Sequence, residues 1–417
     1  MKMEVLKIAT AGSVDDGKST LIGRLLYETK SLTSDKLEAI ESSSKKKGYD
    51  YLDFSLATDG LVAEREQGIT IDVAHIYFST VKRSYIIADT PGHIEYTRNM
   101  VTGASTSQVS IILIDARKGI IEQTYRHFFI NNLLRVRDVI VAVNKMDLVD
   151  FSEDKFNEIK AGIIKISKSS AYKDQHISFV PISALKGDNI TEKSVNTPWY
   201  NGISLLDSLE TLELNGEKEN SPFRFPVQMV VRPKTESHHD YRGYAGKVYG
   251  GDIQIGDEVT ILPTKTTSKV KDIQLFNEQF DSASPGDSVT ISLEDDVNIS
   301  RGDMIVKSNE LPRIDKSVNA TVCWMDNNNL KPASKYILQH GVNSVLARIK
   351  SVETESIAVL NDNQPVKQEL YINDLGKVQI DLSKPIFVDD YAINKSNGSF
   401  ILIDPVSNAT AGVGFIG

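Results

Sequence analysis

Short, almost continuously apolar runs recur in the first half of the chain. They occupy residues 5–10, 85–88, 109–115, 139–143 and 177–182. A run that is apolar at nearly every position predicts a strand buried on both faces. Helical patterns lie between the runs, and this alternation predicts a mostly parallel sheet with helices on both sides.

One segment between the runs shows the helical pattern clearly. Phe156, Ile159, Ile163 and Ile166 lie three or four residues apart, so they share one face of a helix. Ser152 comes just before the segment, and its hydroxyl oxygen is suited to accept a hydrogen bond from a free N–H of the first turn. We therefore expect a helix with its N-cap at Ser152.

The pattern changes after residues 215–222, which are polar, end in proline and are typical of a linker. Beyond them, short strand-like segments alternate with turns rich in Gly, Asn, Asp and Pro, and this favours β-barrels. We expect two small barrels, divided near Leu311 and Pro312. The predicted parts are an α/β domain at 1–214, a linker at 215–222, and all-β barrels at 223–310 and 311–417.

The composition is ordinary for a soluble protein. Of 417 residues, 47 are basic and 56 acidic, and the formal net charge of −9 argues against a broad nucleic-acid-binding surface, though not against a local RNA site. The single cysteine, Cys323, lies in an apolar stretch, which predicts a packed core thiol. We find neither a signal-peptide pattern nor about 18 consecutive apolar residues, so we expect a cytoplasmic protein without a membrane span.

Residues 12–19 fit the pattern G-x-x-x-x-G-K-[ST] between a predicted strand and a predicted helix. In that setting the glycines let backbone N–H groups point at a phosphate, and the helix N-terminus adds partial positive charge. Lys18 would reach the β- and γ-phosphates, and the Ser19 hydroxyl would bind Mg²⁺. The alternative is a glycine turn without a ligand, which the flanking elements disfavour. Asp15 either contacts a monovalent cation or caps the loop.

Two further stretches suit a nucleotide switch in the predicted α/β domain. Asp89 ends a predicted strand, where it can hold Mg²⁺ through water, and Gly92 can offer its N–H to a γ-phosphate. Thr70 would give its hydroxyl to Mg²⁺ and its N–H to the γ-phosphate, and loss of that phosphate would release the segment. An ordinary strand threonine is the alternative for Thr70.

Two motifs indicate the base. Asn144 and Asp147 follow the predicted strand at 139–143. An aspartate can accept the N1 and N2 N–H groups of guanine, and an asparagine can contact the O6 and N7 side. Adenine has the opposite pattern, and buried polar groups left unpaired can reject the wrong base by roughly 10⁴–10⁵. Residues 183–185 follow the next strand and suit a loop that supports guanine. Asn144 and Asp147 predict GTP rather than ATP, and so an α/β P-loop GTPase domain.

Residues 31–58 form an insertion before the switch threonine. Residues 34–37 have the pattern of a helix start, whereas 42–48 are polar and predict a solvated loop. The adjacent His238 and His239 also predict a solvated loop rather than a metal site, because neighbouring strand residues face opposite ways and no third ligand is evident.

The order of these motifs resembles the GTPase domain of translation-factor GTPases. More narrowly, several stretches resemble the large subunit of bacterial sulfate adenylyltransferase. These stretches are 63–72, 88–93, 96–100, 102–105, the insertion at 31–58, 232–233, 242–246, and the ending at 402–404 and 411–416. The resemblance covers nearly the whole chain and is weaker between about 310 and 400. One departure is Ile94-Glu95, where the family has glutamate and glutamine.

The resemblance implies a heterodimer. In this family a small catalytic subunit makes adenylyl sulfate and pyrophosphate from ATP and sulfate, and the large subunit couples this uphill reaction to GTP hydrolysis. The sequence has neither a second phosphate loop nor an H-x-G-H-type motif. We therefore expect another chain to bind ATP, and we expect no fused adenylyl-sulfate kinase. A separate kinase is an open partner, and neither nucleic acid nor a membrane is expected.

The resemblance also implies roles for the residues of the motifs. His93 would orient the attacking water, with a structural turn histidine as the alternative, and Lys18 would neutralise phosphate charge. The expected catalytic residues are His93, Lys18 and Thr70, and the expected Mg²⁺ ligands are Ser19, Thr70 and Asp89. The expected GTP-binding residues are Gly12, Ser13, Val14, Asp15, Asp16, Gly17, Lys18, Ser19, Thr20, Asp89, Gly92, Asn144, Lys145, Asp147, Ser183, Ala184 and Leu185.

Three functions compete at this point. The favoured one is the GTPase subunit of sulfate adenylyltransferase. An elongation-factor-like carrier of aminoacyl-tRNA is the second, and the acidic balance, the insertion and residues 98–100 and 242–244 count against it. A signalling or scaffold switch is the third, since two barrels suit protein or RNA contact equally well.

Overall fold

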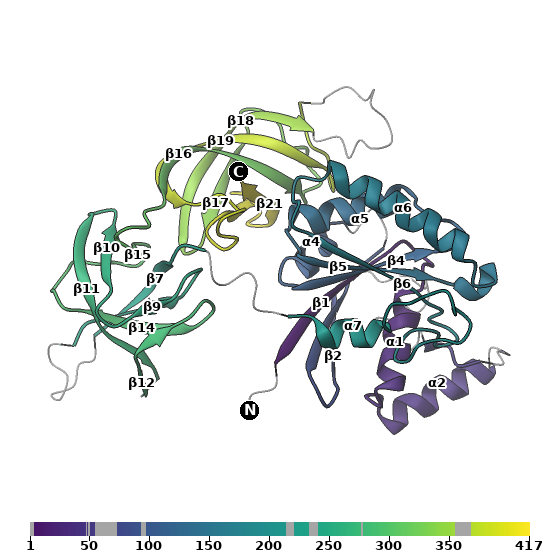
Figure 1. Ribbon diagram of the computed structural model, residues 1–417. Helices are drawn as coiled ribbons and strands as arrows, with labels where there is room; N and C mark the ends of the chain where they lie inside the picture. The colour runs from purple at the N-terminus through teal and green to yellow at the C-terminus, as the bar shows by residue number, and fades with distance from the viewer. Residues whose placement is uncertain are drawn as a thin grey trace. The chain divides into compact units, whose positions relative to one another are not determined.

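The computed structural model describes most of the chain (Figure 1). Thr70, His93, His238 and His239, for which the sequence makes predictions, lie outside the described residues. The described residues up to 213 form one unit, and those from 221 onward form a second. The described residues are 4–46, 48, 51–54, 73–92, 97–213, 221–232, 241–276, 278–354 and 368–417.

A six-stranded sheet forms the centre of the first unit. Its strand order is β2-β3-β1-β4-β5-β6, and all neighbouring pairs are parallel except β2 with β3. The predicted mostly parallel sheet is confirmed. The sequence did not predict β2, because this edge strand is half exposed and has no continuous apolar run. The strands are β1 (Val5–Ala11), β2 (Ala74–Ser79), β3 (Ser84–Asp89), β4 (Val109–Asp115), β5 (Asp138–Asn144) and β6 (His176–Pro181).

Helices cover both faces of this sheet, with α4, α5 and α6 on one side and α1 and α7 on the other (Figure 1). The hydroxyl of Ser152 accepts the Lys155 N–H at 3.3 Å, which confirms the predicted N-cap of α6. In the described part of the chain, no helix is long and apolar enough to cross a membrane. The helices are α1 (Lys18–Glu28), α2 (Ser34–Lys46), α4 (Thr97–Ala104), α5 (Glu122–Leu133), α6 (Glu153–Ser169) and α7 (Leu205–Thr211), with a short 3-10 helix, η3, at Met146–Val149.

Helix α2 corrects one prediction from the sequence. Residues 42–46 belong to this helix and not to a solvated loop. Ser44 is buried, its hydroxyl donates to the Ile40 carbonyl at 2.8 Å, and it accepts the Asp53 N–H at 2.8 Å. A run of serines and lysines carries no apolar periodicity, so the pattern alone did not indicate that this turn contacts Asp53.

Antiparallel strands build the second unit, and the all-β prediction is confirmed. One sheet has the order β10-β15-β7-β8-β14-β11-β12, and β11 also pairs with β10, so the sheet closes on itself. The strands of this part are β7 (Arg224–Val231), β8 (Gly243–Lys247), β10 (Glu258–Leu262), β11 (Thr266–Leu275), β12 (Glu278–Phe280), β14 (Ser288–Leu293) and β15 (Met304–Lys307), with a small pair, β9 (Ile253–Gln254) and β13 (Ser282–Ala283).

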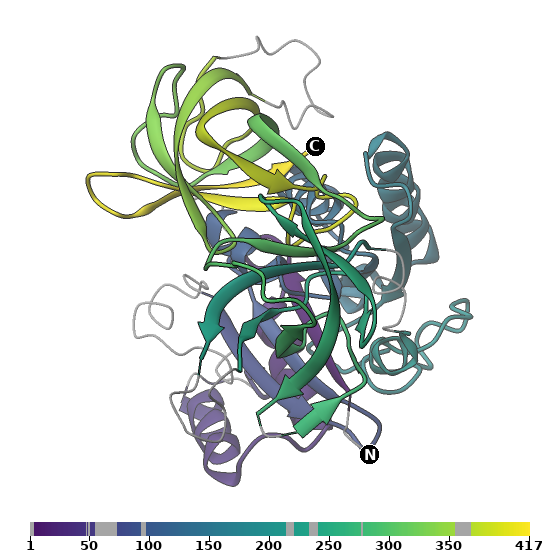
Figure 2. The same ribbon diagram turned by 90° about the vertical axis from the view of Figure 1, so that its left-hand side faces the viewer.

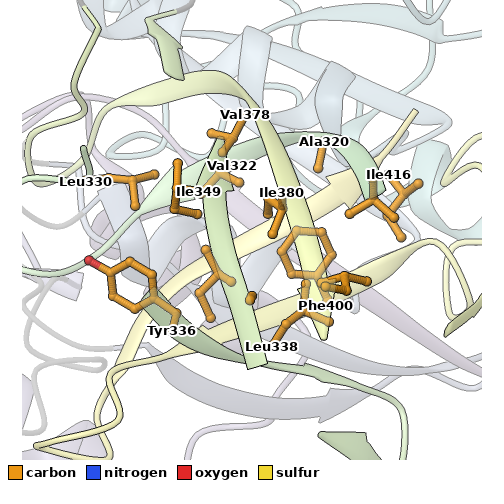
Figure 3. Close-up of a cluster of buried hydrophobic side chains, with 14 of the residues drawn as sticks. Ala320, Val322, Leu330, Tyr336, Leu338, Ile349, Val378, Ile380, Phe400 and Ile416 are labelled. Carbon is orange, nitrogen blue, oxygen red and sulfur yellow. The ribbon is translucent and has the colours of Figure 1, made fainter. Parts of the chain in front are cut away.

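Six further strands form a closed barrel in the order β16-β19-β18-β17-β20-β21. Figure 2 shows these strands, coloured light green to yellow, curving round the barrel. Side chains from several strands meet inside it, among them Val322, Leu338 and Phe400 (Figure 3). Cys323 is buried, which confirms the predicted core thiol. The strands are β16 (Arg313–Trp324), β17 (Lys335–His340), β18 (Asn343–Thr354), β19 (Leu375–Val388), β20 (Ser399–Ile403) and β21 (Thr410–Ile416).

A buried ion pair joins the two β structures of the second unit. Arg224, in β7, donates from Nε and Nη2 to the two carboxylate oxygens of Asp389, which follows β19, and both distances are 2.8 Å. The Arg224 Nη1 donates to the carbonyls of Phe223 and Glu310, and the Asn397 amide donates to Asp389 at 2.7 Å. A buried pair stabilises a protein only when its remaining polar atoms are also satisfied, and this pair meets that condition.

Candidate functional site

The phosphate loop at 12–19 connects the end of β1 to the start of α1, as the pattern predicts. Gly17 has φ 94°, and a Cβ added there would collide with the Asn144 amide. A Cβ added to Gly92 would lie 2.5 Å from Lys18 Nζ and would collide with the Gly12 carbonyl. Both positions therefore require glycine, because two other loops approach the phosphate loop closely.

Lys18 lies beneath this loop with a buried ammonium group. Its Nζ donates to the carbonyls of Gly12 at 2.7 Å and Ser13 at 3.2 Å. Burial lowers the pKa of Lys18, whereas the nearby carboxylates of Asp89 and Asp16 act in the opposite direction. The Asp16 carboxylate also accepts the Ser13 N–H at 2.7 Å. Backbone carbonyls and nearby carboxylates thus hold the Lys18 ammonium group at the loop for which the sequence predicts a phosphate site.

The segment after β3 lies against the phosphate loop. The Thr10 hydroxyl donates to the buried Asp89 carboxylate at 3.2 Å, and the Thr90 hydroxyl donates to the Thr10 carbonyl at 2.5 Å. The Gly92 carbonyl accepts the Gln123 Nε2–H at 3.2 Å. Gln123 and Thr10 were not found from the sequence, because neither belongs to a motif. Their contacts tie the segment that carries Asp89 and Gly92 to β1 and α5.

Asn144 connects the phosphate loop to the predicted guanine loop. Its Nδ2 donates to the Asp16 carbonyl at 2.7 Å, and its Oδ1 accepts the Ala184 N–H at 3.0 Å. Asp147 lies one turn further on, in η3, and is partly exposed. The predicted residues Ser183 to Leu185 follow β6 directly. The structure thus brings the predicted base motifs and the phosphate loop together at the carboxyl end of the sheet, where parallel α/β sheets bind ligands.

Lys145 is held by a carboxylate that the sequence did not single out. Its Nζ lies 3.1 Å from the Asp115 carboxylate and also donates to the Asp15 carbonyl. Burial alone would raise the pKa of Asp115, but hydrogen bonds from Arg117 and Lys145 hold it well below its usual value. Asp115 stays ionised at neutral pH and holds the ammonium group of Lys145 beside Asp15 of the phosphate loop.

A cavity of about 940 Å³ lies along β6 and α6, and no predicted site residue lines it. Phe156, Trp199 and Tyr200 contribute aromatic side chains to its wall. The Tyr200 hydroxyl donates to the Phe179 carbonyl at 3.1 Å and so satisfies one backbone group of the edge strand β6. The residues around the cavity therefore cover the edge strand β6, and the cavity lies apart from the loops that carry the predicted nucleotide-binding residues.

His127 in α5 is buried close to the site. Burial lowers the pKa of His127 to about 3, and the charges of Lys18 and Arg126 act in the same direction. The folded protein therefore keeps this ring neutral down to about pH 3, whereas the unfolded chain protonates it below about pH 6.5. The contribution of the neutral His127 to the free energy of unfolding is fully present above pH 6.5 and is lost progressively as the pH falls towards 3.

The variant His127→Gln tests this. We expect acidification from pH 7 to 4.5 to lower the free energy of unfolding of the wild-type chain by about 3 kcal/mol more than that of the variant, because Gln does not titrate. Urea unfolding at the two pH values measures both. Parallel losses in the two proteins would contradict a neutral buried His127.

The fold and the converging loops define a P-loop GTPase of the translation-factor class. The family model of the elongation factor Tu GTP binding domain matches residues 3–215, and that of the GTP-eEF1A C-terminal domain matches residues 317–417. Sulfate adenylyltransferase subunit 1 of Bacteroides fragilis is 48% identical over 99% of this chain and 86% of its own length.

Other relatives give the same result. Sulfate adenylyltransferase subunit 1 of Bacteroides thetaiotaomicron is 47% identical over 99% of this chain and 86% of its own length. The bifunctional enzyme CysN/CysC of Mycobacterium tuberculosis is 48% identical over 99% of this chain and 67% of its own length. The chain belongs to the sulfate adenylyltransferase subunit 1 family.

Proposed function

We propose that this chain is the GTPase subunit of a cytoplasmic sulfate adenylyltransferase. GTP hydrolysis here would drive the formation of adenylyl sulfate and pyrophosphate from ATP and sulfate on a partner small subunit. The observation that carries the proposal is the convergence of the phosphate loop, Asp89, Asn144 and the Ser183–Leu185 loop at one end of the sheet. Membership of the subunit 1 family supports the particular reaction.

The chemistry of this site would be positioning and charge neutralisation. Lys18 would contact the β–γ bridge, and His93 would orient the attacking water. Asp147 would accept the guanine N–H groups. A separate adenylyl-sulfate kinase is a further partner to test, because one relative is named as bifunctional.

Mg²⁺ suits the oxygen donors of this site. Ser19 lies in the first turn of α1 and Asp89 ends β3, and hydroxyl and carboxylate oxygens are the ligands that Mg²⁺ prefers. The described residues contain no cluster of three His, Cys, Asp or Glu side chains that could hold a metal by themselves. We infer that Ser19, Thr70 and Asp89 would hold Mg²⁺ together with the phosphates, where it would supply positive charge.

The proposal is tested by sulfate-dependent release of pyrophosphate from ATP. The chain is purified from its own host together with any chain that accompanies it, and release is measured with and without GTP. We expect release that rises with GTP and requires the second chain. If a second chain is present and no nucleotide supports release, the proposal fails, and salt-sensitive binding of aminoacyl-tRNA is the next function to measure.

The role of His93 has its own test. We expect His93→Ala to slow single-turnover GTP hydrolysis by about 100-fold, because a misplaced water reacts slowly, while the Kd for GTP stays within about twofold. His75→Ala, at an exposed position of β2, is the control and should change neither value. Equal losses of binding and hydrolysis would mean that His93 is structural.

A further inference from the structure

The insertion at 31–58 is attached to α1 by a buried aromatic residue. Phe54 is 2% exposed. A Cβ added to Gly23, in α1, would lie 2.9 Å from the Phe54 Cβ and would collide with the Phe54 carbonyl, so the two backbones are in close contact. The Tyr27 ring, one turn further along α1, lies 5.1 Å from the Phe54 ring. Phe54 therefore packs tightly against the helix that begins at the phosphate loop.

Arg24 connects this packing to the predicted guanine loop. Its guanidinium carbon lies 4.5 Å from the centre of the Phe54 ring. Its Nε donates to the Ala184 carbonyl at 3.1 Å, and its Nη2 donates to the Leu185 carbonyl. Glu28 lies 3.5 Å from the Nη1. One side chain of α1 thus touches both the insertion and the loop that follows β6.

Both backbone polar groups of Ala184 are hydrogen-bonded to side chains. Asn144 accepts its N–H at 3.0 Å, and Arg24 donates to its carbonyl at 3.1 Å. The planar guanidinium can bind two carbonyls while its face rests on an aromatic ring, which an ammonium cannot do. The alternative is that Arg24 only forms the i, i+4 ion pair with Glu28. That role would not explain its contacts with the Phe54 ring and with the two carbonyls.

We propose that Arg24 is a positioning residue for the guanine loop and that Phe54 holds Arg24 in place. Through Phe54, the described residues 51–54 of the insertion would then affect how long a guanine nucleotide stays bound. This inference rests on the proposed binding of GTP. It gives the insertion a role in nucleotide exchange, because any ligand of the insertion that shifts Phe54 would loosen the loop under the base.

The test is the dissociation rate of a fluorescent GDP analogue from the full chain. Removing the charged donor in Arg24→Met should raise this rate by about 10-fold or more. Phe54→Leu should raise it by about threefold, since the ring contacts with Arg24 and Tyr27 are lost while the hydrogen bonds of Arg24 can still form. The double variant should dissociate no faster than Arg24→Met alone, because Phe54 acts through Arg24. Arg24→Lys keeps the charge, so its dissociation rate should lie between those of the wild type and Arg24→Met.

A matched control is available in the same unit. The Arg135 guanidinium lies 4.9 Å from the centre of the Tyr172 ring, and neither residue belongs to the nucleotide loops. Arg135→Met should leave the rate within about twofold of the wild type.

Three outcomes overturn the inference. They are an unchanged rate in both Arg24 variants, independent effects that multiply in the double variant, and an equal effect of Arg135→Met. If Arg24→Met does not fold, Arg24→Lys and Phe54→Leu decide the result. A wild-type chain that does not bind the analogue would instead refute the proposed binding of GTP.

Discussion

Asp147→Asn is expected to lower the affinity for GTP by at least about 100-fold and to raise the affinity for xanthosine triphosphate. The aspartate offers two acceptors to the guanine N1 and N2 N–H groups, and asparagine keeps only one of them. Xanthine carries a carbonyl in place of the 2-amino group, so the new amide donor has a partner. Isothermal titration with the two nucleotides measures both affinities.

The control for this experiment is a second aspartate with the same change in charge. Asp154 lies in the exposed first turn of α6, and Asp154→Asn should leave both affinities unchanged. An Asp147→Asn variant with the GTP affinity of the wild type would remove the argument that the Asn144–Asp147 motif selects guanine. A loss for both nucleotides would mean that Asp147 supports the loop rather than the base.

Arg224→Met is expected to destabilise the second unit by about 3–5 kcal/mol. The variant leaves the buried Asp389 carboxylate without its two hydrogen bonds from Arg224, and an uncompensated buried charge is costly. The carbonyls of Phe223 and Glu310 would also lose a donor. Urea unfolding of the full chain, followed through the transition of the second unit, measures the change.

Arg313→Met provides the matched control in the same unit. Arg313 pairs with Asp390 at 2.8 Å, but its side chain is 52% exposed. Exposed ion pairs contribute about 0–1 kcal/mol, so this variant should lose much less stability than Arg224→Met. Similar losses in the two variants would show that the buried pair has no special role in joining the two β structures.

The local pattern of the sequence determined the main features of the first unit. Buried parallel strands are apolar at nearly every position, so β1, β4 and β5 stood out without any knowledge of their neighbours. The phosphate loop and the segment at Asn144 were found because their chemistry requires particular residues close together in the chain. The carboxyl ends of parallel strands share one edge of the sheet, so these motifs could be expected to meet.

Other features required the tertiary structure, because they depend on residues far apart in the chain. Nothing near Gln123, Arg24 or Arg224 indicates a partner, yet each binds a group in a distant segment. The helical state of residues 42–46 likewise depends on the contact between Ser44 and Asp53. The sequence by itself determined the buried strands of the first unit and the candidate nucleotide motifs, since these follow from local hydrophobicity and chemistry. Only the fold decided how Phe54, the predicted guanine loop and the two β structures are held, since those contacts form after the chain has brought the segments together.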